Sequence, residues 1–284
     1  MNIFKYFIFL LLPSCMSIYK APIQVTPAMK EKGDLAVAVA TTYYWAQTAM
    51  FGSPKLGFSG YLAYSPLNHL YVGASADKVS RNKGGHKYSN HSSYQFLTGY
   101  YRSLNKENKA YFDFQAGGGM GKGRDYFYYE GSSYEMEHGK IFYGKFWNAY
   151  IQPGIHLGKK SFKTDLGIKF NLVHIYNQHQ ISMNWRTNVQ NCEYLIAPTN
   201  TLFLEPSGTI RMKEGPFNYF VQGFLSLPTG KRSSSGNNNF NGYIRPQLLN
   251  FYVGISVSLT EDFNLYKVFK KPPAIRNIRK DKLD

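Results

Sequence analysis

The stretch that decides the fold is residues 249–259, which read Leu249-Asn250-Phe251-Tyr252-Val253-Gly254-Ile255-Ser256-Val257-Ser258-Leu259. Apolar side chains occupy every odd position of this run, while Asn, Tyr, Gly and Ser occupy the even positions. Because successive side chains of a β-strand point to opposite faces, the two sets separate onto two faces. The segment therefore predicts a strand with one lipid-like face and one small, polar face.

The same two-residue period recurs along the chain from Gly33 onward. It predicts ten strands, each near or above the roughly ten residues that a tilted strand needs to cross a bilayer. Pro153 and Pro206 fall inside predicted strands and count against them, since proline removes a ladder hydrogen bond. The expected strands are 34–44, 55–65, 69–79, 92–103, 109–122, 144–157, 161–176, 201–213, 217–228 and 247–260.

The connections between these strands alternate in length. Short turns are expected at 66–68, 105–108, 158–160 and 214–216, and long polar loops at 45–54, 80–92, 123–143, 177–200 and 228–246. Short periplasmic turns alternating with longer extracellular loops are typical of bacterial outer-membrane barrels. We therefore predict an all-β, antiparallel, up-and-down transmembrane β-barrel of ten strands. Eight strands are the chief alternative for the barrel, and a soluble β-sandwich is the alternative fold.

Composition and charge agree with a membrane barrel. Aromatic residues make up 17% of the 284 residues, with 24 Tyr and 21 Phe, while the mean hydropathy is only -0.37. Aromatic girdles and a polar interior produce such a combination. The net charge of +16 is scattered over loops and the C-terminal tail, which argues against nucleic acid as a partner. Outer-membrane lipid, lipopolysaccharide, or an extracellular protein or glycan suit this surface better.

The first residues have the organisation of an export signal. A cationic residue, Lys5, precedes the apolar run 7–12, and Leu12-Pro13-Ser14-Cys15 resembles a bacterial lipobox, in which the cysteine is acylated. We predict a signal peptide (1–14), a lipidated Cys15 at the start of a periplasmic linker (15–32), a barrel domain (33–260) and a basic periplasmic tail (261–284). Both termini are then expected on the periplasmic side of the outer membrane.

Two segments carry a resemblance to a known group of proteins. The first runs from Cys15 to Leu35, with Tyr19, Ala21-Pro22, Pro27 and Lys30-Glu31-Lys32-Gly33-Asp34-Leu35, and the second is Phe203-Leu204-Glu205-Pro206-Ser207-Gly208-Thr209-Ile210-Arg211. Both resemble segments of a family of Bacteroidetes outer-membrane β-barrel proteins, many of them predicted lipoproteins. The resemblance implies location and fold. It transfers no catalytic residue, because most members of that family have no assigned activity.

Alternation places a set of polar residues on the same side as the small residues, which is the expected lumen. We expect opposite charges in this set to pair and fill a narrow interior, because an unpaired buried charge is costly. The alternative is a lipid-modifying or proteolytic enzyme that uses His156 with Asp165 or Glu205 as acid and base, although no spacing identifies a nucleophile. The predicted lumen network consists of Asp113, Gln115, Gln152, His156, Asp165, Lys169, Glu205 and Arg211.

Outside the strands, the aromatic residues of the third long loop are candidates for contact with a protein or a glycan. They are Tyr126, Phe127, Tyr128 and Tyr129, and an interfacial girdle is the alternative for them. The glycine-rich run 117–123 lacks the Ser or Thr that a phosphate-binding loop needs, so we expect it to make room for bulky neighbours in the lumen or to allow a bend. No cofactor, metal or catalytic site is predicted. The expected function is non-enzymatic surface binding or envelope structure, with a narrow pore as the second possibility.

Overall fold

The computed structural model describes residues 19, 21–24, 27, 29, 31–44, 55–83, 86–105, 109–129, 138–159, 161–184, 189–214, 217–229 and 249–258. Within these ranges no helix is long and apolar enough to cross a membrane. The strands are β1 (Leu35–Tyr44), β2 (Lys55–Leu67), β3 (Leu70–Lys83), β4 (His86–Ser103), β5 (Ala110–Tyr129), β6 (His138–Lys159), β7 (Phe162–Asn184), β8 (Val189–Ile196), β9 (Thr199–Glu214), β10 (Phe217–Leu225), β11 (Leu227–Pro228) and β12 (Leu249–Ser258).

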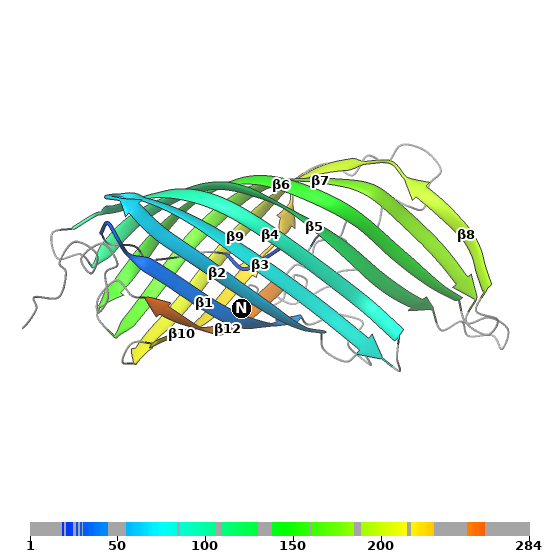
Figure 1. The fold of residues 1–284 in the computed structure, drawn as a ribbon, viewed down its shortest axis with the longest axis horizontal. Coiled ribbons are helices and arrows are strands. Elements are labelled where there is room, and N and C mark those ends of the chain that lie inside the picture. Colours follow the sequence, from blue (N-terminus) through cyan, green and yellow to red (C-terminus); the bar gives the residue numbers. More distant parts are fainter. Residues whose placement is uncertain are drawn as a thin grey trace, which may run out of the picture.

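Ten of these strands close into a barrel (Figure 1). Strands β1 to β7 pair in sequence order, β7 then pairs with β9, and the ring continues through β10 and β12. Strand β12 pairs antiparallel with β1, which closes the ring. The remaining two strands, β8 and β11, pair with the edges of β7 and β9. The ten-stranded antiparallel barrel is therefore confirmed, and the eight-stranded and sandwich alternatives are excluded.

Each predicted segment overlaps one strand of the ring, but the segment 217–228 is wrong in detail. Ser226 divides it into β10 and the two-residue β11. The break lies beside Pro206 of β9, because β10 pairs with β9 as far as Ser207 and β11 resumes pairing at Leu204. The hydroxyl of Ser226 donates a hydrogen bond of 2.8 Å to Glu205 Oε1. The proline therefore sits where the ladder to β10 is interrupted, as proline in a sheet requires.

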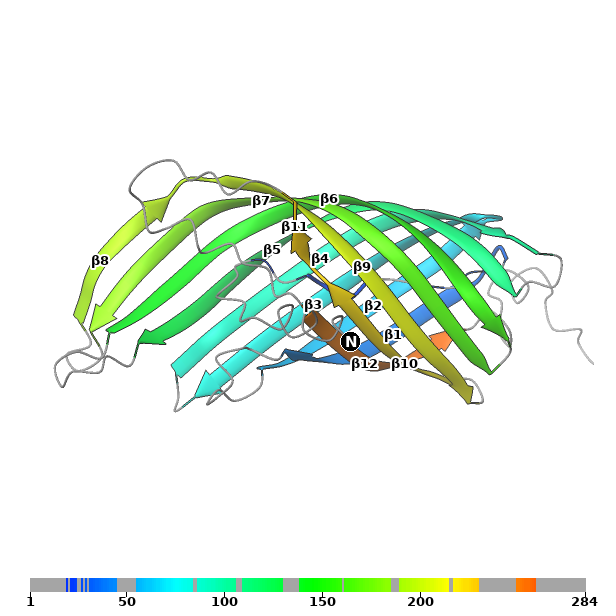
Figure 2. The ribbon, with the colours of Figure 1, turned by 180° about the vertical axis from the view of Figure 1, so that it is seen from behind.

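Three predicted loops are largely strand. Strands β5, β6 and β7 contain 20, 22 and 23 residues, which exceeds the crossing length of about ten. As a result β5 and β6 pair through positions 123–129, and β7 pairs with β8 through positions 178–184. Strands β5 to β8 therefore extend well past the other strands of the barrel (Figure 2). The loop expected at 80–92 similarly becomes the ends of β3 and β4, and most of the loops 45–54 and 228–246 lies outside the described residues.

The barrel has an apolar outer face and a polar interior. Phe96 and Val39 on the outer face are 69% and 66% exposed, whereas Gln115 and Lys169 in the interior are almost fully buried. On β6 the outward positions from Leu157 to Trp147 form an apolar row that spans ten residue steps. With a rise of about 3.3 Å per residue and a tilt of about 40°, this row is about 25 Å high, which matches the apolar band of outer-membrane barrels.

Inward-facing glycines make room for large rings, as the sequence predicted. An added Cβ on Gly117 would lie 2.8 Å from the Tyr150 ring, and one on Gly121 would lie 2.4 Å from the Phe146 ring. Gly99 on β4 is covered in the same way by Tyr71. These glycines allow side chains from neighbouring strands to lie flat across the inner wall.

Candidate functional site

All eight residues of the predicted lumen network are buried inside the barrel. They come from β5, β6, β7 and β9, and the register explains which of them meet. His156 lies opposite Asp165, Lys169 lies opposite Glu205, and Gln115 lies opposite Gln152. Directly opposite residues have Cβ atoms about 5 Å apart, so the alternating pattern brings complementary groups into contact.

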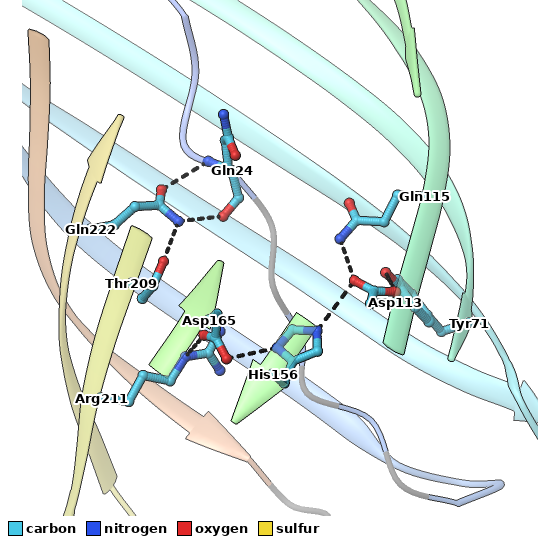
Figure 3. Close-up of polar contacts among 9 residues, drawn as sticks. All are labelled: Gln24, Tyr71, Asp113, Gln115, His156, Asp165, Thr209, Arg211 and Gln222. Carbon is cyan, nitrogen blue, oxygen red and sulfur yellow. Dashed lines mark hydrogen bonds and ion pairs between the residues drawn. The ribbon is translucent and has the colours of Figure 1, made fainter. Parts of the chain in front are cut away.

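A first group of polar residues lies near the short turns, and we call it the lumen ring. Its members are Tyr71, Asp113, His156, Asp165 and Arg211 (Figure 3). His156 Nδ1 is 2.7 Å from Asp165 Oδ1, and Nε2 is 3.4 Å from Asp113 Oδ2. Arg211 Nε forms a 2.7 Å ion pair with the other oxygen of Asp165.

The lumen ring continues onto neighbouring strands through Asp113. The Tyr71 hydroxyl donates to Asp113 Oδ1 at 2.7 Å, and the Gln115 amide donates to Oδ2 at 2.8 Å. The residues belong to β3, β5, β6, β7 and β9, so the contacts link five strands of the barrel. When the imidazole is protonated, two carboxylates face one guanidinium and one imidazolium, and the ring is neutral.

The geometry of His156 does not resemble that of a catalytic base. A general base holds one ring nitrogen toward the proton that it accepts. Both nitrogens of His156 instead face carboxylates, and no hydroxyl or thiol nucleophile is hydrogen-bonded to the ring among the described residues. The ring is also buried, with only 9% of the side chain exposed. The arrangement can hold charges in place and link strands.

A second group lies farther from the short turns, and we call it the central cluster. It contains Asp77, Gln95, Tyr150, Lys169 and Glu205, all of them buried. The Lys169 ammonium lies 3.9 Å from the centroid of the Tyr150 ring and 3.4 Å from Gln95 Oε1. A cation above a tyrosine ring is attracted to the ring face, and the attraction is stronger when water is excluded.

The central cluster is completed by the N-terminal segment, which we define as the described residues between 19 and 29. Each of these residues is buried. The Tyr19 hydroxyl donates to Glu205 Oε1 at 3.2 Å and accepts from Asn171 at 2.5 Å. Its ring stacks on Phe203 and meets Phe146 edge-on, with both centroids 5.2 Å away. Tyr19 is therefore held inside the barrel.

Backbone groups of the N-terminal segment bind inward side chains from several strands. Gln222 of β10 accepts from the Gln24 backbone N–H and donates to its carbonyl, both at 3.0 Å (Figure 3). The Ile23 N–H donates to Asp77 at 3.1 Å, and the Tyr252 hydroxyl donates to the Ala21 carbonyl at 3.0 Å. Asp77, Gln222 and Tyr252 thus replace the strand partner that this segment lacks.

This position corrects the predicted periplasmic linker. The Lys32 N–H donates to Asn68 in the β2–β3 turn and the Gly33 N–H donates to the Ser65 carbonyl near the end of β2, at the end with the short connections. From there the chain runs into the lumen, because Tyr19 reaches Phe146, 13 residues before the end of β6. The segment has no two-residue period and contains prolines, so the sequence suggested a solvated linker. Its polar and aromatic groups instead complete the interior.

Several functional residues were missed by sequence reasoning. Tyr71 and Asp77 share the inward positions of β3, and the same alternation that identified Asp113 could have found them. Tyr19, Gln24 and Gln222 carry no such signal as a group, because their contacts join residues up to 198 positions apart. No local pattern predicts which segment enters the lumen.

The remaining predicted sites fall at the margins of the structure. Cys15 and the basic tail 261–284 lie outside the described residues. Tyr126, Phe127, Tyr128 and Tyr129 are not in a loop, since they form the end of β5 and pair with positions 138–141 of β6. Within the described ranges, no group of three or more His, Cys, Asp or Glu is arranged to hold a metal ion.

The closed ring, the outer apolar band and the polar lumen together define a β-barrel of the bacterial outer-membrane type. No family model matches the chain, and no curated protein matches its sequence. Solved structures with a similar fold include the outer membrane protease OmpT from Escherichia coli, at 11% identity, a TM-score of 0.46, and coverage of 80% of this chain and 94% of that one.

Two further barrels are similar in fold. The translocator domain of the autotransporter NalP from Neisseria meningitidis is 9% identical, with a TM-score of 0.43 and coverage of 79% of this chain and 86% of that one. Outer membrane phospholipase A from Escherichia coli is 8% identical, with a TM-score of 0.29 and coverage of 84% and 93%. At these identities the similarity is one of fold.

Proposed function

We propose that this protein is a closed outer-membrane barrel with a non-enzymatic role in surface binding or envelope structure. The observation that carries the proposal is the N-terminal segment in the lumen. It bonds to β3 through Asp77, to β9 through Glu205 and to β10 through Gln222. A segment anchored to separate parts of the wall, beside a paired charge network, favours a filled interior over an open channel.

The charge network supports a structural role for the polar residues. His156 is enclosed by Asp113 and Asp165 and has no nitrogen directed at a nucleophile. An enzyme that used this histidine would lose all hydrolysis of phospholipid or peptide substrates in a His156→Ala variant. Activity of the wild type that disappears in that variant would replace our proposal with the enzymatic one.

The extended wall supports a surface-binding role. Strands β5 to β7 continue beyond the apolar band on the side of the long connections, and β8 adds to the edge of β7. In outer-membrane barrels this side is extracellular. The paired ends of β5 and β6, which include Tyr126 to Tyr129, would then project from the membrane as a sheet that a protein or glycan ligand can contact.

The first test is location and compactness. The outer-membrane fraction is run on SDS gels with and without boiling. We expect the protein in that fraction, with a mobility that shifts on boiling, because closed barrels resist SDS until they are heated. A soluble protein with no shift would contradict an outer-membrane location.

Conductance in planar bilayers separates the filled barrel from the narrow pore. We expect wild-type protein to give no steady channel current, and a Tyr19→Ala/Gln222→Ala variant to open, because both substitutions release the N-terminal segment. Thr41→Ala, on the outer face, is the matched control and should stay closed. A steady current from the wild type would establish the pore instead.

Acylation of Cys15 remains part of this proposal, on the evidence of the lipobox-like residues 12–15. Cys15 lies four positions before Tyr19 in the chain, and four steps of extended chain span at most about 14 Å. Labelling with radioactive palmitate, compared between the wild type and Cys15→Ala, tests it. Label in the wild type alone supports a lipoprotein, and an unlabelled wild type removes the anchor from the proposal.

A further inference from the structure

A group of exposed cations lies on the outer face of β3, β5 and β6. Its members are Lys78, Lys122, Arg124 and Lys145, and we call it the cationic row. Each is exposed and lies an even number of residues from exposed apolar residues of its strand, so it has the same outward orientation as they do. The row therefore faces the surroundings of the barrel and not the lumen.

Strand register brings the cationic row together. Lys122 lies directly opposite Lys145, and Ser92 of β4 joins Lys122 to Lys78 across two strand pairings. The two opposite lysines have Cβ atoms about 5 Å apart, and Lys78 lies about 10 Å from Lys122 at two strand spacings. Arg124 is two residues beyond Lys122 on the same face.

The row begins where the apolar band ends. On β6, Trp147 is the last apolar outward residue before Lys145, and on β5 Met120 directly precedes Lys122 on the same face. Trp147 and Met120 are 42% and 64% exposed. A molecule that covers both surfaces must therefore carry apolar chains next to anionic groups, which describes a lipid and not an acidic protein or nucleic acid.

No carboxylate on the described outer face of β3 to β7 neutralises the positive charge of the cationic row. The outward positions of β3 to β7 that the structure describes include no Asp or Glu. Like charges directly opposite each other across two strands are destabilising, so Lys122 and Lys145 favour an anion between them. Phosphate suits this place, since lysine binds it as a point charge and several lysines can share its oxygens.

We propose that the cationic row binds the phosphates of a phosphorylated glycolipid of the outer leaflet, the lipid A part of lipopolysaccharide. The proposal rests on the proposed function, because the long connections must face outward for the row to reach that leaflet. The glycolipid places its acyl chains along Met120 and Trp147 and its phosphates over Lys122 and Lys145. Lys78 and Arg124 extend the row to a second phosphate.

The test measures lipid binding to the full chain refolded in detergent micelles. Bisphosphorylated lipid A and the same lipid without phosphate are titrated, and bound lipid is counted by native mass spectrometry. We expect the Lys122→Gln/Lys145→Gln variant to bind bisphosphorylated lipid A about tenfold more weakly than the wild type, since two charge-assisted contacts are lost. Phosphate-free lipid A should bind both proteins equally weakly.

Arg102→Gln is the matched control, because Arg102 is exposed on the outer face of β4 near the short turns. It should bind lipid A like the wild type. Equal binding by the double variant and the wild type, or equal binding of the two lipids by the wild type, would show that the row is a solvated edge and overturn the site. A protein that fails the gel and fractionation test would instead overturn the outer-membrane location itself.

Discussion

The lumen ring and the central cluster are both built from buried charges, yet they are completed in different ways. In the lumen ring, the described contacts pair Asp113, His156 and Asp165 with residues of the wall strands. In the central cluster, Glu205 accepts from Tyr19, and Asp77 accepts from the backbone of Ile23. One layer is closed by the strands, and the other needs the N-terminal segment.

This difference teaches how a ten-stranded lumen can be filled. Near the short turns, Arg211 and His156 bind carboxylates on the strands next to their own, so the buried charges pair along the wall. Farther from the short turns, Gly117 and Gly121 leave room inside the lumen, and the rings of Tyr150 and Phe146 lie over them. The N-terminal segment lies in this part of the lumen, and inward side chains of the wall form hydrogen bonds with its backbone groups.

The largest effect is expected from Arg211→Met in the lumen ring. Methionine keeps much of the volume but removes the guanidinium that pairs with Asp165 Oδ2, while the imidazole of His156 stays paired with Oδ1. Removing one partner of a buried ion pair costs about 3–5 kcal/mol of unfolding free energy. Urea unfolding in detergent micelles, followed by the gel shift, measures the loss.

Arg102→Met serves as the control for this substitution, because its side chain is exposed and its loss should leave the unfolding midpoint unchanged. A loss below about 1 kcal/mol for Arg211→Met would mean that the lumen ring does not depend on that ion pair. The layer would then be closed by packing and by Tyr71 and Gln115.

A smaller effect is expected from Gly99→Ala, which tests whether the lumen ring is rigid. The new Cβ would lie 2.1 Å from the ring of Tyr71, whose hydroxyl is bonded to Asp113. Overpacking of this kind costs about 1–3 kcal/mol. Gly208→Ala is the matched control, since its Cβ meets only Leu166 at 3.7 Å. Equal stability of the two variants would show that Tyr71 moves freely.

Much of the barrel follows from the sequence, and the reason is physical. Strand alternation is a local property with one answer at each position, so the ring strands and the inward placement of His156 and Asp165 could be predicted. Strand ends could not, because β5 to β7 continue by pairing with one another beyond the apolar band. The location of Tyr19 depends on contacts with Phe146 and Phe203, which no local pattern encodes.

Tyr19→Phe examines the central cluster with a single lost hydroxyl. The ring contacts with Phe203 remain, while Glu205 and Asn171 each lose a hydrogen-bond partner. We expect a loss of about 1 kcal/mol in unfolding free energy. Tyr219→Phe, on the outer face and 42% exposed, should cause no change. An unchanged unfolding free energy for Tyr19→Phe would mean that the hydrogen bonds of Tyr19 do not stabilise the barrel.

The smallest expected quantity is a coupling energy, and it bears most directly on the difference between the two layers. The contacts of Tyr19 and Gln222 both hold the N-terminal segment in the lumen. Loss of one contact therefore weakens the attachment to which the other contributes. In a double-mutant cycle, Tyr19→Phe with Gln222→Ala should deviate from additivity by about 0.5 kcal/mol or more. Tyr19→Phe with Arg211→Met should be additive, because these residues share no partner among the described contacts. If the second pair couples as strongly as the first, the two layers form one unit, and the N-terminal segment then supports the lumen ring as well as the central cluster.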